Sequence, residues 1–268
     1  MVAFEGGPFG IAHQHEDKLS FVMYADGKQV LTEGNTYAYD TSDMRSYILT
    51  ARAHNTIAVD GKYQNRRAEY TTAHEAEPDY INTPANIQSN LADGVDYVGA
   101  TYDEGFGDDC ERLAEHNRSL YLIKNEEGLS PFVICVDRVE ADNEHNYDIL
   151  WQLDADELNI DGTSISADTL NIIPSSAINS VKTVFGQQEP TFQGWTADDA
   201  KQGSERKIYT AFCSFSGTNK RVVSVFYPDG GKECPISTVE ASDDINDSII
   251  TIKLTNGKTF TFNEDEHK

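Results

Sequence analysis

Two histidines and an aspartate near the start of the chain have side chains suited to chemistry. The stretch "HQHED" places His13, His15 and Asp17 at alternate positions, so in an extended chain all three would point to one side. Imidazole transfers protons near neutral pH and, when neutral, binds divalent metals. The motif therefore predicts a metal site, a catalytic site, or a polar strand that carries two histidines by chance.

A metal site needs three or four ligands, and the chain supplies further donors downstream. Glu33 and Asp40 lie in "LTEGNTYAYD", and His54 lies in "TARAHNTIAVDG". Two histidines with one carboxylate suit zinc with an open position for water, although other divalent ions accept the same ligands.

The expected turn at Asp26-Gly27 bears on which carboxylate completes the site. If this dipeptide closes a two-residue hairpin, Asp40 lies opposite His13, and the register favours Asp40 over Glu33. Glu33 reaches the histidines only if "HQHED" belongs to a loop that folds back before the strand begins near Lys18. The glycines and proline of "GGPFG" permit such a loop.

Short apolar runs with period-two alternation dominate the rest of the chain, separated by turn dipeptides such as Asp60-Gly61 and Asn256-Gly257. Long amphipathic helical patterns are nearly absent. The pattern predicts an all-β fold, a large antiparallel β-sandwich that forms a single domain over residues 1–268, with the metal and substrate motifs in 1–70. The polar stretch 196–207 is typical of a long surface loop.

The net charge of -24 is unevenly spread along the chain. Residues 1–70 hold 7 Lys and Arg against 9 Asp and Glu, so the motif region is close to neutral. Because the chain as a whole repels polyanions, nucleic-acid binding is not expected. No apolar run predicts a membrane span, and "MVAFEGGPFG" lacks the features of a signal peptide. Since the chain begins almost inside its first motif, we expect that Met1 heads a fragment whose natural N-terminal part was removed.

The four cysteines show no CxxC or CxxH spacing, which excludes a zinc knuckle or a redox motif of that kind. Their apolar surroundings favour buried free thiols, with one or two disulfides as the alternative. They are Cys110, Cys135, Cys213 and Cys234.

Several motifs follow one another in a specific order. "HxHxDKLSF" comes first, then an acidic residue directly before a glycine eighteen positions after His15, and then "AHNT". In this order the first 70 residues resemble the C-terminal domain of the heparinase II/III family of polysaccharide lyases, which includes oligoalginate lyases. Downstream, "HNRSLYLI", "PFVICVDRV", "LWQLD" and "QGW" fit the family's pattern more loosely, so the resemblance covers most of the chain.

The resemblance implies a β-sandwich that packs behind an N-terminal helical toroid of the same protein, a domain absent from this chain. It implies a divalent metal on His15, Glu33 and His54, most simply zinc, with calcium or manganese as alternatives. His13 would then face the substrate, and Asp17 would support the strand. The family usually has Asp where this chain has Glu33, which leaves the metal's identity open. We follow the resemblance in preferring Glu33 over Asp40.

The resemblance also implies β-elimination at a uronic acid of an acidic polysaccharide, such as a heparan-sulfate-like glycan, by a bacterial protein that is periplasmic or extracellular. The reaction needs a group that neutralises the uronate carboxylate, a base at C5 and an acid for the departing O4. His13 can serve as the neutralising donor or as the base. The remaining acid/base comes largely from the helical domain in the family, so we expect the isolated chain to be inactive or weakly active.

Four further side chains are candidates for contact with the substrate. Tyr37 and Tyr39 lie between the predicted metal ligands, although tyrosines two apart in a strand also serve as packing. Arg66 and Arg67 could hold a carboxylate or sulfate through paired hydrogen bonds, and solvation of the surface explains them equally well.

Two other classes of protein remain as alternatives. One is a non-catalytic carbohydrate-binding or structural sandwich module. The other is a cupin-type metalloprotein, which also uses HxH, but the glutamate expected shortly after the second histidine is replaced here by "LSF".

Overall fold

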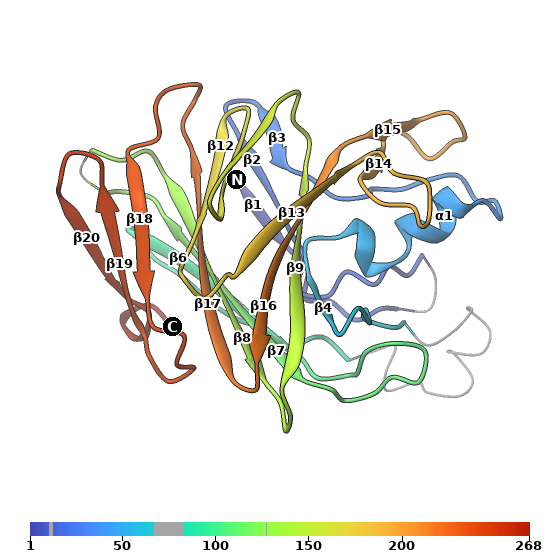
Figure 1. The fold of residues 1–268 in the computed structure, drawn as a ribbon, viewed down its shortest axis with the longest axis horizontal. Coiled ribbons are helices and arrows are strands. Elements are labelled where there is room, and N and C mark those ends of the chain that lie inside the picture. Colours follow the sequence, from blue (N-terminus) through green and yellow to red (C-terminus); the bar gives the residue numbers. More distant parts are fainter. Residues whose placement is uncertain (11–12, 67–82, 127) are drawn as a thin grey trace.

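The computed structural model of the chain describes residues 1–10, 13–66, 83–126 and 128–268, and its strands form a sandwich of two layers (Figure 1). One layer is an antiparallel sheet of eight strands in the order β10-β11-β12-β17-β8-β7-β6-β5. Its strands are β5 (Gln88–Leu91), β6 (Val95–Tyr102), β7 (Glu115–Ile123), β8 (Phe132–Glu140), β10 (Leu158–Asp161), β11 (Ser164–Ala167), β12 (Leu170–Pro174) and β17 (Lys220–Pro228).

The other layer consists of two smaller sheets. A four-stranded sheet has the order β13-β16-β9-β4, and a three-stranded sheet has the order β1-β2-β3. The two lie side by side, because the Thr32 amide just after β3 donates to the Gln152 carbonyl of β9 at 2.9 Å. The strands are β1 (Val2–Phe4), β2 (Phe21–Ala25), β3 (Lys28–Leu31), β4 (Ile57–Val59), β9 (His145–Leu153), β13 (Ser180–Phe185) and β16 (Tyr209–Gly217).

The main hydrophobic core fills the space between these layers. Trp151 of β9 is fully buried there, and its ring meets those of Phe21 on β2 and Phe226 on β17 at centroid distances of 5.7 and 4.9 Å. The facing strands supply alternate apolar side chains to this core, as the period-two pattern of the sequence requires. The prediction of an all-β antiparallel sandwich is confirmed.

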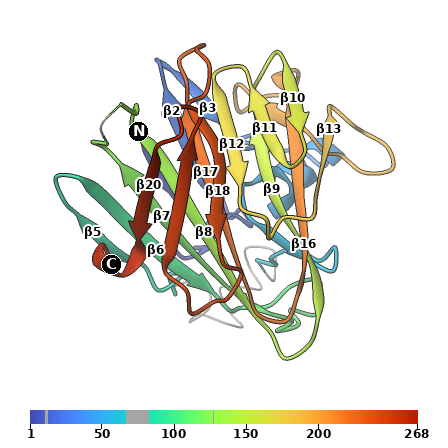
Figure 2. The ribbon, with the colours of Figure 1, turned by 60° about the vertical axis from the view of Figure 1, so that its left-hand side comes forward.

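A further three-stranded sheet covers the outer face of the eight-stranded sheet. It consists of β18 (Ile236–Ala241), β19 (Ile249–Leu254) and β20 (Thr259–Asn263), and Figure 2 shows it in red in front of β7, β8 and β17. A second hydrophobic cluster lies between the two sheets. Because both faces of β8 are covered, the strand is apolar almost throughout, as "FVICV" shows.

The short elements differ from what the sequence predicted. Residues 196–207 are not a plain surface loop, because β14 (Trp195–Ala197) and β15 (Glu205–Lys207) pair in a hairpin and all of β14 is buried. The helix α1 (Asp43–Ile48) was not predicted, because six residues are too few to show a helical period.

Short 3-10 turns η1 (Ala51–Ala53) and η2 (Glu264–Glu266) complete the described elements, and no described helix is long and apolar enough to cross a membrane. All four cysteines are free, and two of them are buried.

A charged cluster lies inside the main core, on β7 and β8. Asp137 accepts hydrogen bonds from Arg118 Nε and from His116 Nε2, both at 2.7 Å, and all three side chains are buried. Burial alone would raise the pKa of Asp137, but the Arg118 guanidinium and His116 outweigh that effect and hold the pKa below its ordinary value. Burial lowers the pKa of His116, so its ring stays neutral in the folded protein.

Acidification should therefore destabilise the fold through His116. When the pH falls below the pKa of histidine in the unfolded chain, about 6.5, the unfolded chain binds a proton at this residue and the folded chain does not. This difference lowers the free energy of unfolding by up to about 1.4 kcal/mol per pH unit. His116→Asn lacks this titration, so the stability advantage of the wild type should shrink as the pH falls from 7 to 5. Urea unfolding at several pH values measures this, and a constant difference between the two proteins would contradict it.

Candidate functional site

The "HQHED" segment lies in an irregular loop rather than in a strand. β2 begins only at Phe21, and the backbone of His13 has a φ of 59°. The expectation that alternation along an extended chain aligns His13, His15 and Asp17 is therefore wrong. The loop nevertheless brings His15 and Asp17 together by folding back before β2, as the "GGPFG" stretch permits.

The hairpin between β2 and β3 explains why its register misleads. Ala25 pairs with Lys28 as predicted, but a bulge between Met23 and Tyr24 shifts the register beyond them. Asp40 is engaged elsewhere, since its carboxylate accepts hydrogen bonds from Ser42 Oγ at 2.6 Å and from Gln202 Nε2 at 2.8 Å.

Glu33 lies against His54, and the glycine that follows it makes this approach possible. A Cβ on Gly34 would lie 2.8 Å from the Cβ of Ala53 and 2.9 Å from Ile48 Cδ1, so only glycine allows the two segments to pack this closely. The Gly34 amide donates to the Ala53 carbonyl at 2.7 Å. Glu33 Oε2 consequently lies 2.9 Å from His54 Nδ1.

The structure adds Asp17 to the candidate ligands. One atom each from His15, Asp17 and His54 forms a group whose members all lie within 4.8 Å of one another. The rings of His15 and His54 have centroids 5.3 Å apart. The sequence signal for Asp17 was its place two residues after His15, but its proximity to His54 depends on the loop.

The pKa values of these groups are shifted strongly. Burial lowers the pKa of His15 to about 3, and burial raises the pKa of Asp17 to about 7. For Glu33, burial alone would raise the pKa, but the hydrogen bond with His54 outweighs it and the pKa is lowered. For His54, burial alone would lower the pKa, and the contact with Glu33 raises it. Opposite shifts within one cluster are typical of functional sites.

The donor set fits a divalent cation. His54 Nε2 lies 3.1 Å from the Ile48 carbonyl, to which it donates its proton, and this leaves Nδ1 to face the carboxylate of Glu33. Two acceptors that face each other at this distance need a proton or a metal ion between them. At protein metal sites a ligand histidine usually donates its other ring N–H to a carbonyl or carboxylate, which fixes the tautomer. His15 and Asp17 supply a second nitrogen and a second carboxylate.

His13 points to a different set of side chains. Its Nδ1 is hydrogen-bonded to the Tyr39 hydroxyl, and the two rings meet edge to face with centroids 5.6 Å apart. The guanidinium carbon of Arg45, from α1, lies 4.7 Å from the centroid of the Tyr39 ring. Tyr39 is 66% exposed and His13 is exposed, so this trio of His13, Tyr39 and Arg45 can meet a substrate.

The remaining predicted substrate contacts lie differently. Tyr37 is only 4% exposed and packs in a hydrophobic cluster with residues of α1. Its hydroxyl donates to Glu205 at 3.2 Å. Tyr37 is therefore a packing residue, and the prediction that it contacts the substrate is corrected. Arg66 is half-buried and donates to the Leu49 carbonyl at 3.0 Å, beside Glu16 of the histidine loop. Arg67 lies outside the described residues.

The β14–β15 hairpin supports this site from one side. Thr196 Oγ1 donates to the carbonyl of Glu33 at 2.7 Å, and Asn35 donates to Thr196 Oγ1 at 3.0 Å. Gln202 and Glu205 bind Asp40 and Tyr37 on either side of Tyr39. A stretch that the sequence suggested to be a surface loop therefore holds the segment that carries both Glu33 and Tyr39.

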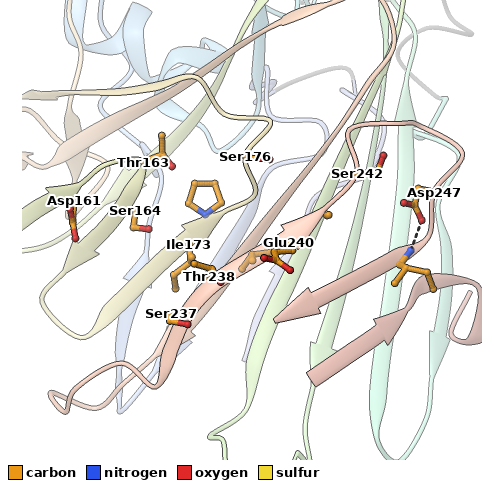
Figure 3. Close-up of a pocket in the computed structure, with 14 residues that line it drawn as sticks. Asp161, Thr163, Ser164, Ile173, Ser176, Ser237, Thr238, Glu240, Ser242 and Asp247 are labelled. Carbon is orange, nitrogen blue, oxygen red and sulfur yellow. Dashed lines mark hydrogen bonds between the residues drawn. The ribbon is translucent and has the colours of Figure 1, made fainter. Parts of the chain in front are cut away.

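A separate groove lies between the end of the eight-stranded sheet and β18 (Figure 3). Its volume is about 690 Å³, and small hydroxyl side chains line it together with the carboxylates of Asp161, Glu240 and Asp247. Among its lining residues there is no cationic side chain, so an anionic ligand would find repulsion there.

The fold is that of the β-sandwich in heparinase structures. Heparan sulfate lyase HepC from Pedobacter heparinus is 17% identical, with a TM-score of 0.72 over 100% of this chain and 40% of that protein. A heparinase III structure is 16% identical, with a TM-score of 0.64 over 96% of this chain and 37% of that protein. The chain thus spans about two fifths of the length of these proteins. A search of curated protein sequences finds no match.

The family profile described as "Heparinase II/III-like, C-terminal" matches residues 1–261. This chain belongs to that family. The resemblance stated from the sequence motifs is confirmed, and the fold gives the cupin alternative no support.

Proposed function

We propose that this chain is the β-sandwich part of a lyase that cleaves uronic-acid-containing polysaccharides by β-elimination. The observation that carries the proposal is a trio of His13, Tyr39 and the half-buried Arg45 on the same loop system as the cluster of His15, Asp17, Glu33 and His54. His13 and Tyr39 are exposed, and His54 is buried. The similar structures are named as heparan sulfate lyase and heparinase III, which supports a sulfated or unsulfated polyuronide as the substrate.

The trio supplies groups that the elimination requires. Arg45 and His13 can donate hydrogen bonds to the uronate carboxylate, and this raises the acidity of the C5 proton. The second nitrogen of His13 or the Tyr39 hydroxyl can accept or deliver a proton, since the two share a hydrogen bond. The remaining acid or base is proposed to come from an N-terminal helical toroid domain of the same protein, so this chain alone is expected to show weak or no turnover.

We propose a divalent metal, most simply zinc, held by His15, His54 and the carboxylates of Asp17 and Glu33. When bound, the ion would supply charge and fix the orientation of these ligands. The histidine loop and the segment after α1 would then be held together, which keeps His13 at the surface beside Tyr39. Manganese is an alternative because it accepts carboxylates, whereas calcium takes oxygen ligands and would use only Asp17 and Glu33 of this set.

The ultraviolet absorbance of unsaturated uronides tests the lyase proposal directly. The full-length protein, incubated with heparan sulfate, hyaluronan, alginate and related polyuronides, should produce this absorbance with at least one of them. No product from any of these substrates would remove the lyase assignment and favour a non-catalytic carbohydrate-binding or structural module.

His13→Ala and Tyr39→Phe in the full-length protein should lower kcat/KM by about 10²–10⁴-fold and about 10-fold or more, respectively, because each removes a group that transfers or directs a proton. Both variants should keep the bound metal. Tyr24→Phe, which alters another exposed tyrosine on β2, is the control and should leave turnover unchanged. Loss of metal in His13→Ala would mean that both histidines of the motif are ligands.

A further inference from the structure

We propose that Arg118 is a positioning residue that holds the two segments carrying the candidate metal ligands in register with each other, an inference that rests on the metal site proposed above. Arg118 lies on β7, outside every motif that the sequence assigned to the site. Its side chain is fully buried in the core between the two layers.

One nitrogen of Arg118 contacts both segments at once. Nη1 donates to the Leu19 carbonyl at 2.8 Å and also to the Asn55 carbonyl. Leu19 follows Asp17 by two residues, and Asn55 directly follows His54. The same guanidinium nitrogen therefore joins the histidine loop to the segment of His54.

The rest of the guanidinium is fixed to the sheet. Nε and Nη2 donate to Oδ1 and Oδ2 of Asp137 at 2.7 and 3.3 Å, and His116 Nε2 is also hydrogen-bonded to Oδ1. The aromatic rings of Phe21 and Trp151 pack against it, with centroids 5.7 and 5.0 Å from its central carbon. Because Asp137 fixes the edge of the planar guanidinium that carries Nε and Nη2, the N–H groups of Nη1 can point in one direction only.

The backbone that Arg118 contacts is strained. Leu19 has a φ of 66°, a conformation that a leucine rarely adopts and that persists only when surrounding contacts enforce it. The Leu19 amide donates to Glu5 and its carbonyl accepts from Arg118, so both ends of this residue are held. This turn reverses the chain directly after Asp17, and without it His15 and Asp17 would not face His54.

Asn55 extends the same connection to the carboxylate side of the cluster. Its Nδ2 donates to the carbonyls of Phe21 and Thr32 at 2.8 and 2.5 Å, and its amide donates to Ser20 Oγ at 2.9 Å. Thr32 immediately precedes Glu33. Arg118 is therefore connected, directly or through Asn55, to the three segments that carry the candidate ligands: the histidine loop, the residues around Glu33 and the residues around His54.

Zinc affinity of the 268-residue chain tests this inference. The double variant Arg118→Met with Asp137→Asn removes the buried ion pair without leaving a lone buried charge, so the chain retains most of its stability. It also removes the donor to Leu19 and Asn55. We expect the Kd for zinc, measured by competition with a chelating dye, to rise about 10–100-fold, the range found when groups that orient metal ligands are lost.

A matched control exists on the opposite face of the same sheet. Arg221 on β17 is equally buried, pairs with the buried carboxylate of Glu264 and donates to the carbonyls of Ser242 and Ile249. Arg221→Met with Glu264→Gln removes a buried arginine–carboxylate pair far from the histidine loop, and it also takes the counter-charge from Arg138, which costs additional stability. This control should lose stability yet bind zinc as the wild type does.

The outcomes separate the two proposals. If the wild type binds zinc and the Arg118 variant binds it equally well, the positioning role is overturned while the metal site stands. If the wild type binds no zinc, the proposed metal site itself is overturned, and the positioning role falls with it. Should the double variant fail to fold, Arg118→Lys replaces it, because the single ammonium of lysine cannot pair with Asp137 and also reach both carbonyls, and an unchanged Kd would again overturn the role.

Discussion

Replacing Glu264 with alanine should lower the free energy of unfolding by about 3–5 kcal/mol, because it leaves buried guanidinium groups without a counter-charge. Glu264 is fully buried at the start of η2, where Oε1 accepts from Arg221 Nη2 and from Arg138 Nη2, both at 2.7 Å. The Tyr121 hydroxyl donates to Oε2 at 3.1 Å. The residue therefore fixes the end of the chain to the outer face of the eight-stranded sheet.

Glu266→Gln provides the comparison two positions further on. Glu266 is exposed and accepts only a hydrogen bond from Asn263 at 3.1 Å, so its replacement should change the stability by no more than about 0.5 kcal/mol. Urea unfolding followed by circular dichroism measures both variants. A loss of less than about 1 kcal/mol for Glu264→Ala would show that the two arginines find other partners or reach water.

His54→Ala should abolish bound metal and also lower the stability of the metal-free chain. The variant removes the nitrogen that faces Glu33 and the donor to the Ile48 carbonyl, and it leaves the half-buried Glu33 without its principal partner. We expect elemental analysis after zinc loading and desalting to fall from about one ion per chain to none. The metal-free variant should lose about 1–3 kcal/mol of stability.

His145→Ala is the matched control, since His145 also contacts a carboxylate, Asp60 Oδ2, at 2.6 Å, but at the β4 turn instead of the histidine loop. This variant should keep its metal. Unchanged metal content in His54→Ala would refute the assignment of His54 as a ligand. Loss of metal from both variants would indicate that zinc binds to histidines in general rather than at one site.

Much of the fold could be predicted because the relevant signals are local. The Asp26-Gly27 and Asp60-Gly61 turns are present, with positive φ at all four residues, since a tight hairpin requires that backbone. Period-two alternation predicted strands that face a core on one side. The β14–β15 hairpin was missed because its central residues are polar, and its burial comes from packing against residues 33–37, which are distant in sequence.

The candidate site was predictable in its residue types and only partly in its geometry. His15, Asp17 and His54 lie together, Glu33 contacts His54, and His13 lies at the surface beside Tyr39. The place of Asp17 beside His54 and the contribution of Arg45 were not anticipated. Arg45 lies on a helix too short to be recognised, and Asp17 reaches the cluster only because the chain reverses at Leu19.

By itself, the sequence determined the strand-rich class of the fold, the family and the chemical character of the histidine motif, because alternation, turn dipeptides and motif order are properties of neighbouring residues. Only the tertiary structure decided which carboxylates join the histidines, that Tyr37 is packing while Tyr39 is accessible, and that Arg118 reaches the site from another layer. These facts depend on a β-bulge, a left-handed leucine and a buried ion pair between strands. Each of these is fixed by contacts between segments far apart along the chain, and so no local pattern records it.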